Sequence, residues 1–132
     1  QAVARMYNEE AAKYSATMAT GFALLSIDRE NGSPSTTLGP KMGMEATSLT
    51  RTLKSMEERG LITRKKNPTD GRGVIIQLTK EGKEKRELSK ETVLRFNETV
   101  KQHISEEKLQ HFMEVAEIIN ELITDKKIYN DK

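Results

Sequence analysis

Residues 49–82 read LTRTLKSMEERGLITRKKNPTDGRGVIIQLTKEG. A helical periodicity over residues 46–59 ends at Gly60, and glycine commonly closes a helix in the left-handed conformation. Two short β-branched segments, 61–66 and 73–79, then flank a loop that is rich in cations and glycine. This order predicts an amphipathic helix followed by a β-hairpin with a long basic tip.

Three helices are expected before this stretch. Residues 2–16 are rich in helix formers, and a second helix spans about 18–29 before a stop signal at residues 31–32. The hydroxyl residues of 33–37 can cap a third helix. That helix should be short, because Gly39 and Pro40 weaken it and the proline removes a backbone donor.

Two long helices are expected after the hairpin. Thr79 can cap one that runs to about Gln102, and Ser105 can cap the last. The apolar positions of the last helix are spaced by three and four, which forms a seam for packing against another helix. They are Leu109, Phe112, Ala116, Ile119 and Ile123, with Met113, Ile118 and Leu122 beside them. Pairing with a second copy is the simplest way to bury the flanking helices.

The composition excludes several classes of protein. The chain has 132 residues, enough for one domain, and contains no cysteine. Disulfides, thiolate catalysis and cysteine-bound zinc are therefore excluded. No apolar run approaches the roughly 18 residues that span a bilayer and no signal-peptide pattern is present, so a cytoplasmic protein is expected. The chain opens on Gln1 within a helical pattern, so we expect that an upstream piece is missing.

Residues that could carry chemistry are scarce. His103 and His111 lie on either side of the predicted break at Ser105, where surface or junction packing is favoured over metal binding. No Ser/His/Asp set, phosphate-cradling loop or dinucleotide fingerprint is present. We therefore expect no enzyme activity, no catalytic residue, no metal and no cofactor.

The charge is unevenly distributed along the chain. Residues 47–73 carry seven cations and three acids, whereas residues 81–132 carry ten cations and twelve acids. A basic middle followed by a mildly acidic tail indicates that residues 47–73 face an anion, whereas residues 81–132 serve another purpose.

The 46–59 helix offers a polar face if Leu49, Leu53 and Met56, together with Ala46, point inward. Short hydroxyls permit close approach to a phosphate backbone, and long cations reach base edges. The candidate DNA contacts on this helix are Thr47, Ser48, Thr50, Arg51, Lys54 and Ser55. A merely solvated helix face is the alternative interpretation.

The hairpin offers a second cationic surface. Arg64, Lys65 and Lys66 follow one another on the first arm, where alternation sends neighbours to opposite faces. At the tip, Asp70 is close enough in sequence to accept a hydrogen bond from Arg72. An arginine held in this way can enter a narrow minor groove. A solvated hairpin turn is the alternative.

The run from 38 to 82 closely resembles the MarR (multiple antibiotic resistance regulator) family of bacterial transcription factors. Four features match in order and spacing: Thr-Arg followed by a leucine, the RGLI helix exit, the Asp-x-Arg tip and the LTxxG strand exit. The helices on both sides also match the family layout, so the resemblance covers essentially the whole chain.

The resemblance implies a winged helix-turn-helix, mainly α with a small β-hairpin, flanked by N- and C-terminal dimerisation helices. The expected single domain spans 1–132, with a DNA-binding part at about 18–80 and a dimerisation part at about 1–17 and 81–132. Each subunit's 46–59 helix would lie in the major groove, with its wing over the adjacent minor groove. Arg72 would be the minor-groove residue and Asp70 its support.

The resemblance also implies an effector pocket between the dimerisation helices and the winged helix, often for small aromatic acids or lipophilic compounds. Residues that could line such a pocket are Tyr7, Tyr14, Met18 and Phe22, although simple core packing is the alternative. Two departures from the family pattern stand out. Gly39 and Pro40 replace the usual Ala-Glu, and the tip reads DGR where two consecutive arginines are common.

Taken together, these features predict a homodimeric transcriptional repressor that binds a pseudo-palindromic site in double-stranded DNA and is released by a small-molecule effector. The alternative is a winged helix used as a protein-interaction module, whose basic wing docks an acidic partner.

Overall fold

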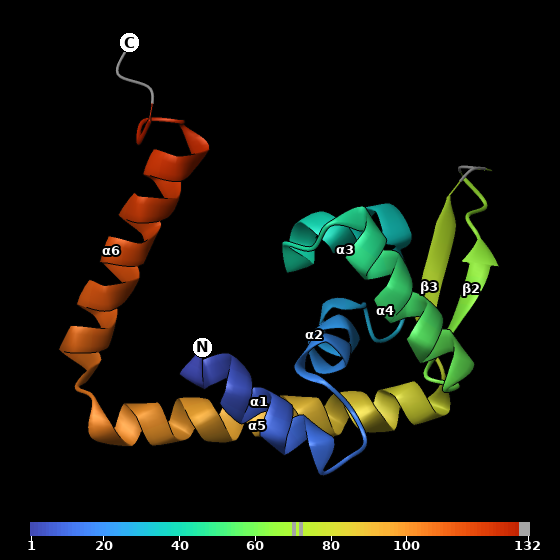
Figure 1. Ribbon diagram of the computed structural model, residues 1–132, viewed down its shortest axis with the longest axis horizontal. Coiled ribbons are helices and arrows are strands. Elements are labelled where there is room, and N and C mark those ends of the chain that lie inside the picture. Colours follow the sequence, from blue (N-terminus) through green and yellow to red (C-terminus); the bar gives the residue numbers. More distant parts are fainter. Residues whose placement is uncertain (70, 72, 130–132) are drawn as a thin grey trace. The chain divides into compact units, whose positions relative to one another are not determined.

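The computed structural model describes residues 1–69, 71 and 73–129 of the 132-residue chain. Its elements follow in the order α1 (Ala2–Ala12), α2 (Met18–Ser26), β1 (Ser33–Pro34), α3 (Ser35–Met42), α4 (Ala46–Glu58), β2 (Ile62–Lys66), β3 (Val74–Leu78), α5 (Lys80–His103) and α6 (Glu106–Thr124) (Figure 1). They form two compact units, Gln1–Val93 and Leu94–Lys132. The mainly helical winged helix-turn-helix predicted from the sequence is confirmed.

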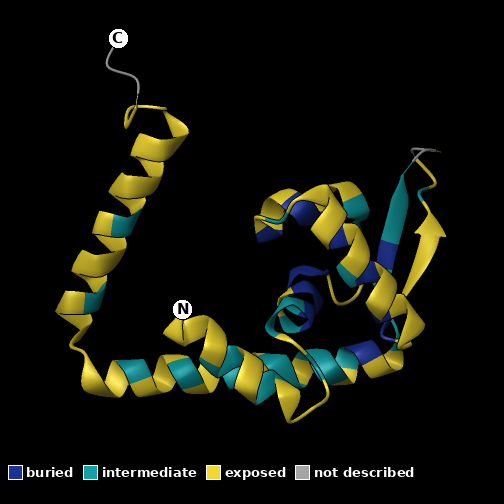
Figure 2. Cartoon of the chain, in the orientation of Figure 1, coloured by how far each residue is buried: buried dark blue, intermediate teal, exposed yellow. Residues whose placement is uncertain are grey.

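The hydrophobic core of the first unit lies between α2, α3, α4 and the sheet (Figure 2). Its most deeply buried large side chains are Leu24, Ile27, Leu38, Met56, Ile62 and Ile76. Burying a side chain of this kind contributes roughly 1.5–3 kcal/mol. The core therefore fixes α4 and the hairpin on one small scaffold, which is what a surface built from both elements requires.

Helix α4 has the amphipathic character that its sequence predicts. Leu49, Leu53 and Met56 are buried, whereas Ala46, which was expected on the same face, is exposed. Gly60 ends the helical segment at φ 75°, and the Leu61 amide donates to the Met56 carbonyl at 2.9 Å. A residue with a Cβ is strained at this φ, so glycine is required where the chain turns from α4 into β2.

The sheet has three strands, although the sequence predicted only the two of the hairpin. The order is β1-β3-β2, all antiparallel, with Ser33 opposite Ile76 and Pro34 opposite Ile75. Strand β1 was missed because two residues are too short to show alternation. Proline is tolerated there because β1 lies at the edge of the sheet, where a missing amide donor matters least.

Helix α2 ends at Ser26, earlier than the predicted end near Arg29. The Asp28 carboxylate accepts hydrogen bonds from the amides of Glu30 and Asn31, at 3.0 and 2.8 Å. These bonds form a turn, and the turn prevents the helix from continuing. Aspartate side chains commonly bond nearby backbone amides in this way. The predicted helix stop at Asn31-Gly32 is wrong, because the helix has already ended at Ser26. Gly32 is left-handed as expected, with φ 73°, and a Cβ there would lie 2.6 Å from the Ile76 carbonyl oxygen, so it serves the turn before β1.

Helix α3 continues through Gly39 and Pro40 to Met42, so the expected weakening does not end it early. Its N-cap is Pro34, which makes no side-chain cap bond, so the predicted hydroxyl cap is wrong. Gly39 is buried, and a Cβ there would lie 3.3 Å from the Met44 carbonyl oxygen. Gly39 therefore allows the close approach of the turn between α3 and α4, a role that propensity alone does not reveal.

The start of α5 is tied to the exit of α4. Thr79 Oγ1 accepts from the Gly82 amide at 3.0 Å, which confirms the predicted cap, and donates to the Gly60 carbonyl at 2.6 Å. A Cβ on Gly82 would lie 2.0 Å from the Leu61 carbonyl oxygen. The LTxxG pattern is therefore explained by one cap and one close backbone contact.

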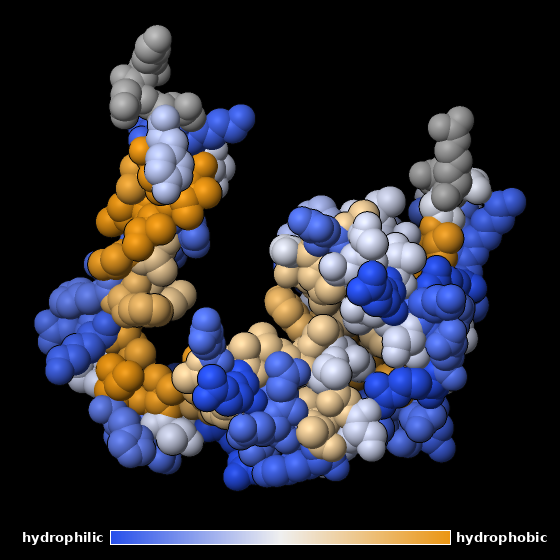
Figure 3. Space-filling view, in the orientation of Figure 1, coloured by the Kyte–Doolittle hydropathy of each residue, from blue (hydrophilic) through white to orange (hydrophobic). Residues whose placement is uncertain are grey.

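The second unit contains the end of α5 and all of α6. Ser105 caps α6 by accepting from the Lys108 amide at 3.2 Å, as predicted. No residue of α6 is buried, and all of its large apolar side chains except the half-buried Leu109 are exposed, with Phe112 at 68% and Ile123 at 58% (Figures 2 and 3). An exposed apolar surface of this kind is typical of a site that contacts another molecule. No described helix is long and apolar enough to cross a membrane.

Candidate nucleic-acid interface and adjoining pocket

The outward face of α4 carries the side chains that the sequence selected. All six are exposed: Thr47, Ser48, Thr50, Arg51, Lys54 and Ser55. Thr50 donates its hydroxyl proton to the Ala46 carbonyl at 2.8 Å, so its oxygen is left to accept bonds. The face therefore combines short hydroxyls near the start of the helix with two long cations farther along.

The N-terminus of α4 is open to an anion. Glu45 precedes the helix in an extended conformation and makes no side-chain cap bond, and the first turn contains no acid. Unsatisfied amides and the helix dipole give this end a partial positive charge. A phosphate oxygen is the kind of acceptor that such an end binds.

The hairpin projects basic side chains beside α4, and hydrophilic side chains cover this part of the surface (Figure 3). Lys65 and Lys66 are exposed on β2. The Asn67 amide donates to the Gly73 carbonyl at 3.0 Å and closes the loop. Asp70 and Arg72 lie outside the described residues, so their roles in the minor groove stay predictions from sequence.

Arg64 differs from the two lysines that follow it. Its Nε lies 3.5 Å from Oε1 of Glu57, in the last turn of α4. Arg64 is therefore paired with a carboxylate on the same surface. Sequence reasoning missed Glu57. The only available signal was an acid at the end of a helix, seven positions before a strand arginine.

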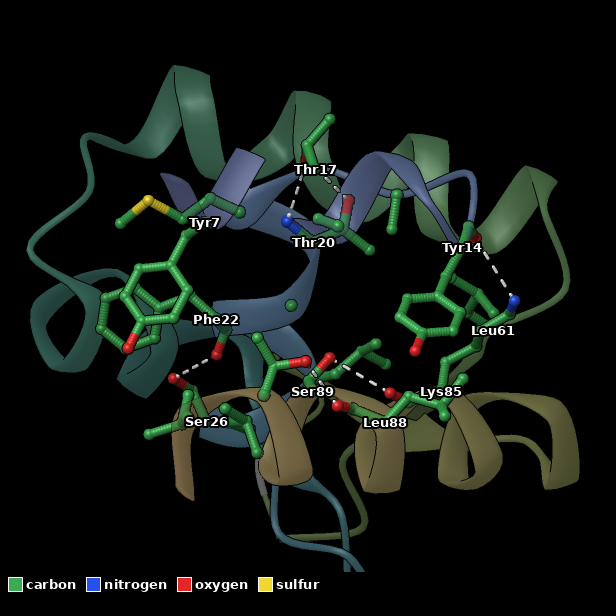
Figure 4. A pocket seen from close by; sticks show the side chains of 18 of the residues that line it. Tyr7, Tyr14, Thr17, Thr20, Phe22, Ser26, Leu61, Lys85, Leu88 and Ser89 are labelled. Carbon is green, nitrogen blue, oxygen red and sulfur yellow. Dashed lines mark hydrogen bonds between the residues drawn. The ribbon is translucent and has the colours of Figure 1, made fainter. Parts of the chain in front are cut away.

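A pocket of about 450 Å³ lies within the first unit (Figure 4). Its lining comes from α1, α2, the ends of α3 and α4, and α5. The four residues that the sequence proposed, Tyr7, Tyr14, Met18 and Phe22, all line it. Tyr7 and Phe22 lie toward one end, and Tyr14 and Lys85 toward the other. A cavity of this size accommodates a small organic molecule.

The lining of the pocket is mostly apolar, with three cations and no acid. The cations are Lys41, Arg59 and Lys85. Lys41 Nζ donates to the Ser26 carbonyl at 2.8 Å, Lys85 Nζ donates to the Tyr14 carbonyl at 3.3 Å, and Arg59 donates to the Ser15 carbonyl. None of them therefore has its charge neutralised by a carboxylate in the lining. Sequence reasoning missed all three, because they come from separate segments of the chain.

Burial shapes one further group in this pocket. Desolvation raises the pKa of Tyr7, because the phenolate would lose hydration there.

Known proteins resemble this chain both in sequence and in fold. It is 31% identical over 78 residues to an uncharacterized HTH-type transcriptional regulator, YdgJ, of Bacillus subtilis (strain 168). That match covers 59% of this chain and 48% of the relative, so the chain spans about half the relative's length.

Two solved structures have a similar fold. One is a mutant MarR from E. coli complexed with operator DNA, with a TM-score of 0.77, 22% identity, and coverage of 87% of this chain and 83% of that one. The other is the PcaV transcriptional regulator from Streptomyces coelicolor with its natural ligand, with a TM-score of 0.73, 18% identity, and coverage of 89% and 85%. At such identities the likeness establishes the fold.

The family model supplies the sequence evidence that the fold comparison lacks. It matches residues 16–74, the segment that contains α2, β1, α3, α4 and β2. This is the segment that builds the cationic surface and much of the pocket lining. Over residues 16–74 the chain is similar to the MarR family.

Proposed function

We propose that the chain is a cytoplasmic, DNA-binding transcriptional regulator that acts as a repressor. The observation that carries this proposal is the exposed hydroxyl-and-cation face of α4 beside a basic hairpin. The match of residues 16–74 to the MarR family supports it, as does the similar fold of a MarR bound to operator DNA.

Helix α4 is the proposed recognition helix. The major groove admits an α-helix and presents a distinct pattern for each base pair. Arg51 reaches base edges and can bond guanine in two places, and Lys54 adds a second long cation. Thr47 and Ser48 lie near the open N-terminus, where a phosphate would be accepted. The side chains that contact phosphate position the protein along the duplex, and Arg51 supplies the preference for a base sequence.

The hairpin is the proposed wing over the adjacent minor groove. Lys65 and Lys66 would neutralise phosphates there, releasing counterions and making affinity fall with salt. By resemblance to the family, Arg72 would enter the minor groove with Asp70 as its support.

A homodimer is proposed as the functional unit, with the exposed apolar surface of α6 covered by a second copy. Two-fold symmetry then requires a pseudo-palindromic operator, with half-sites about one helical turn apart. The resemblance to the MarR family supports this arrangement.

An organic anion with an apolar, aromatic body is the proposed effector. The three cations without a carboxylate in the lining favour an anionic group, and Tyr7 and Phe22 favour an aromatic ring. Arg59 also adjoins the end of α4, so a ligand that draws on Arg59 acts on the recognition helix. Release requires only that the ligand bind better to the DNA-free conformation.

Selection from a random duplex library tests the function. The full chain should enrich a pseudo-palindromic consensus. Enrichment of no sequence, combined with salt-sensitive binding to an acidic protein, would instead favour the protein-interaction module. Repeating the selection with Arg51→Ala is the internal control, because a base-reading arginine should change the consensus at its own position.

A further inference from the structure

We propose that Glu57 and Arg64 form a brace that fixes the angle between the wing and the recognition helix, which makes Glu57 a positioning residue for DNA binding. This inference rests on the proposed DNA-binding function. It changes the role expected of Arg64, from a phosphate contact to a partner of Glu57.

The register of the hairpin places Arg64 on the core side of the sheet. Arg64 lies opposite Ile76, which is fully buried, and two residues after Ile62, which is also buried. Residues two apart on a strand share a face. Lys65 therefore belongs to the opposite face, and only Arg64 of these two neighbours is directed to the side where α4 packs against β2.

Glu57 meets Arg64 from the last turn of α4. It directly follows the buried Met56, so its backbone is held by the core. The Nε to Oε1 distance is 3.5 Å, and the two side chains are 35% and 45% exposed. A pair that is this exposed contributes little to the free energy of folding. The pair matters mainly because it fixes the angle between α4 and β2, and it adds little stability.

The pair spans the turn that joins α4 to β2. Residues 59–61 are the covalent link between α4 and β2, and Gly60 at its centre has φ 75°. Glu57 lies before this link and Arg64 after it. A cross-link on both sides of a glycine turn opposes rotation of the wing about it.

DNA binding depends on that angle. A helix in one groove and a wing in the next must engage together, and holding them in the bound geometry beforehand lowers the ordering cost of binding. The brace also accounts for an acid in a surface that must meet polyanionic DNA. Paired with Arg64, Glu57 adds rigidity at no net charge.

Glu57→Gln distinguishes the brace from simple electrostatics. Removing an acid beside DNA should tighten binding if charge alone matters. The brace predicts the opposite: weaker binding to a labelled duplex carrying the selected site, by about threefold to fivefold in fluorescence anisotropy. Glu58→Gln is the matched control, since Glu58 is the next exposed acid and has no ion pair recorded among the described residues. It should leave affinity unchanged or slightly higher.

Arg64→Gln completes the test through the salt dependence. As a brace, Arg64 should match Glu57→Gln in its effect, the double variant should be no weaker than either single one, and the slope of log K against log salt should stay unchanged. As a phosphate contact, its loss should reduce the slope by about 0.9.

Two results would overturn the inference: a reduced slope in Arg64→Gln, or tighter binding by Glu57→Gln. A wild-type protein that binds no duplex specifically would remove the proposed function itself. Equal thermal midpoints for wild type and variants would establish that the affinity changes are not losses of fold.

Discussion

Gly82 lies so close to Leu61 that a Cβ on it would stand 2.0 Å from the Leu61 carbonyl oxygen. This contact joins the first turn of α5 to the link between α4 and β2. The glycine of the LTxxG pattern is therefore required by packing, independently of any role in binding DNA.

Gly82→Ala should therefore destabilise the fold. The clash is with backbone, which cannot move aside as a side-chain tip can, so we expect a loss of at least about 2 kcal/mol in the free energy of unfolding. Urea denaturation followed by circular dichroism measures it. Gly71→Ala is the control, because no atom of the described residues beyond its chain neighbours lies within 4 Å of a Cβ there, and it should change stability by less than about 0.5 kcal/mol.

Arg51 and Lys65 should differ in how their loss affects DNA binding. Arg51→Ala should cost about 1–3 kcal/mol on the specific site and relax the preference at one base pair. Lys65→Ala should weaken all sequences alike and lower the salt slope by about one. Anisotropy titrations on matched and scrambled duplexes separate the two. Equal losses on both duplexes for Arg51→Ala would mean that it contacts phosphate.

Arg72→Ala should also cost about 1–3 kcal/mol on the specific site, if this residue enters the minor groove as the family resemblance implies. The preference that it loses should be for a narrow, A·T-rich minor groove. The measurement is affinity at moderate salt for sites whose flanks differ in A·T content. Unchanged affinity would remove Arg72 from the interface.

The pocket should distinguish charge on its ligand. An aromatic carboxylate should raise the thermal midpoint, by an amount equivalent to about 2.7 kcal/mol at 100 times its Kd, whereas its neutral amide should bind far more weakly. Lys85→Met should remove this difference, and Lys90→Met, which is outside the lining, should retain it. Equal binding of acid and amide would show that the pocket accepts lipophilic molecules without regard to charge.

Asp28 predicts a specific acid sensitivity. The pKa of its carboxyl is lowered from 3.8 because two backbone amides donate hydrogen bonds to it. The Asn31 amide has the larger effect and the Glu30 amide the smaller. Because the folded pKa lies below the unfolded one, the stability from these bonds is fully present above about pH 3.8 and is lost as pH falls through the folded pKa. Asp28→Asn should flatten the urea midpoint against pH in that window, whereas an unaltered profile would assign the acid sensitivity to other groups.

The local parts of the fold were predictable because their signals are local. Helix α4 has its apolar side chains at helical spacing, Gly60 stands at its exit, and β-branched arms flank the wing loop. The exposed face of α4 follows directly from that periodicity. Ser105 and Thr79 each cap the helix that follows them. Both caps were predictable because a hydroxyl residue stands directly before a polar first turn.

What the sequence did not reveal depends on contacts between distant segments. Strand β1 exists only because Ser33 and Pro34 pair with β3. The cationic lining of the pocket brings together Lys41 of α3, Arg59 just after α4 and Lys85 of α5, and no spacing in the chain indicates that they meet. The Glu57–Arg64 pair likewise depends on how the hairpin packs on α4.

Footprinting on duplex DNA that carries the selected site tests the central claim most directly. The account predicts protection of two half-sites about one helical turn apart, symmetric about a central base pair or step, and lost in Arg51→Ala at equal protein concentration. Uniform protection along the duplex, or identical footprints from wild type and Arg51→Ala, would contradict it.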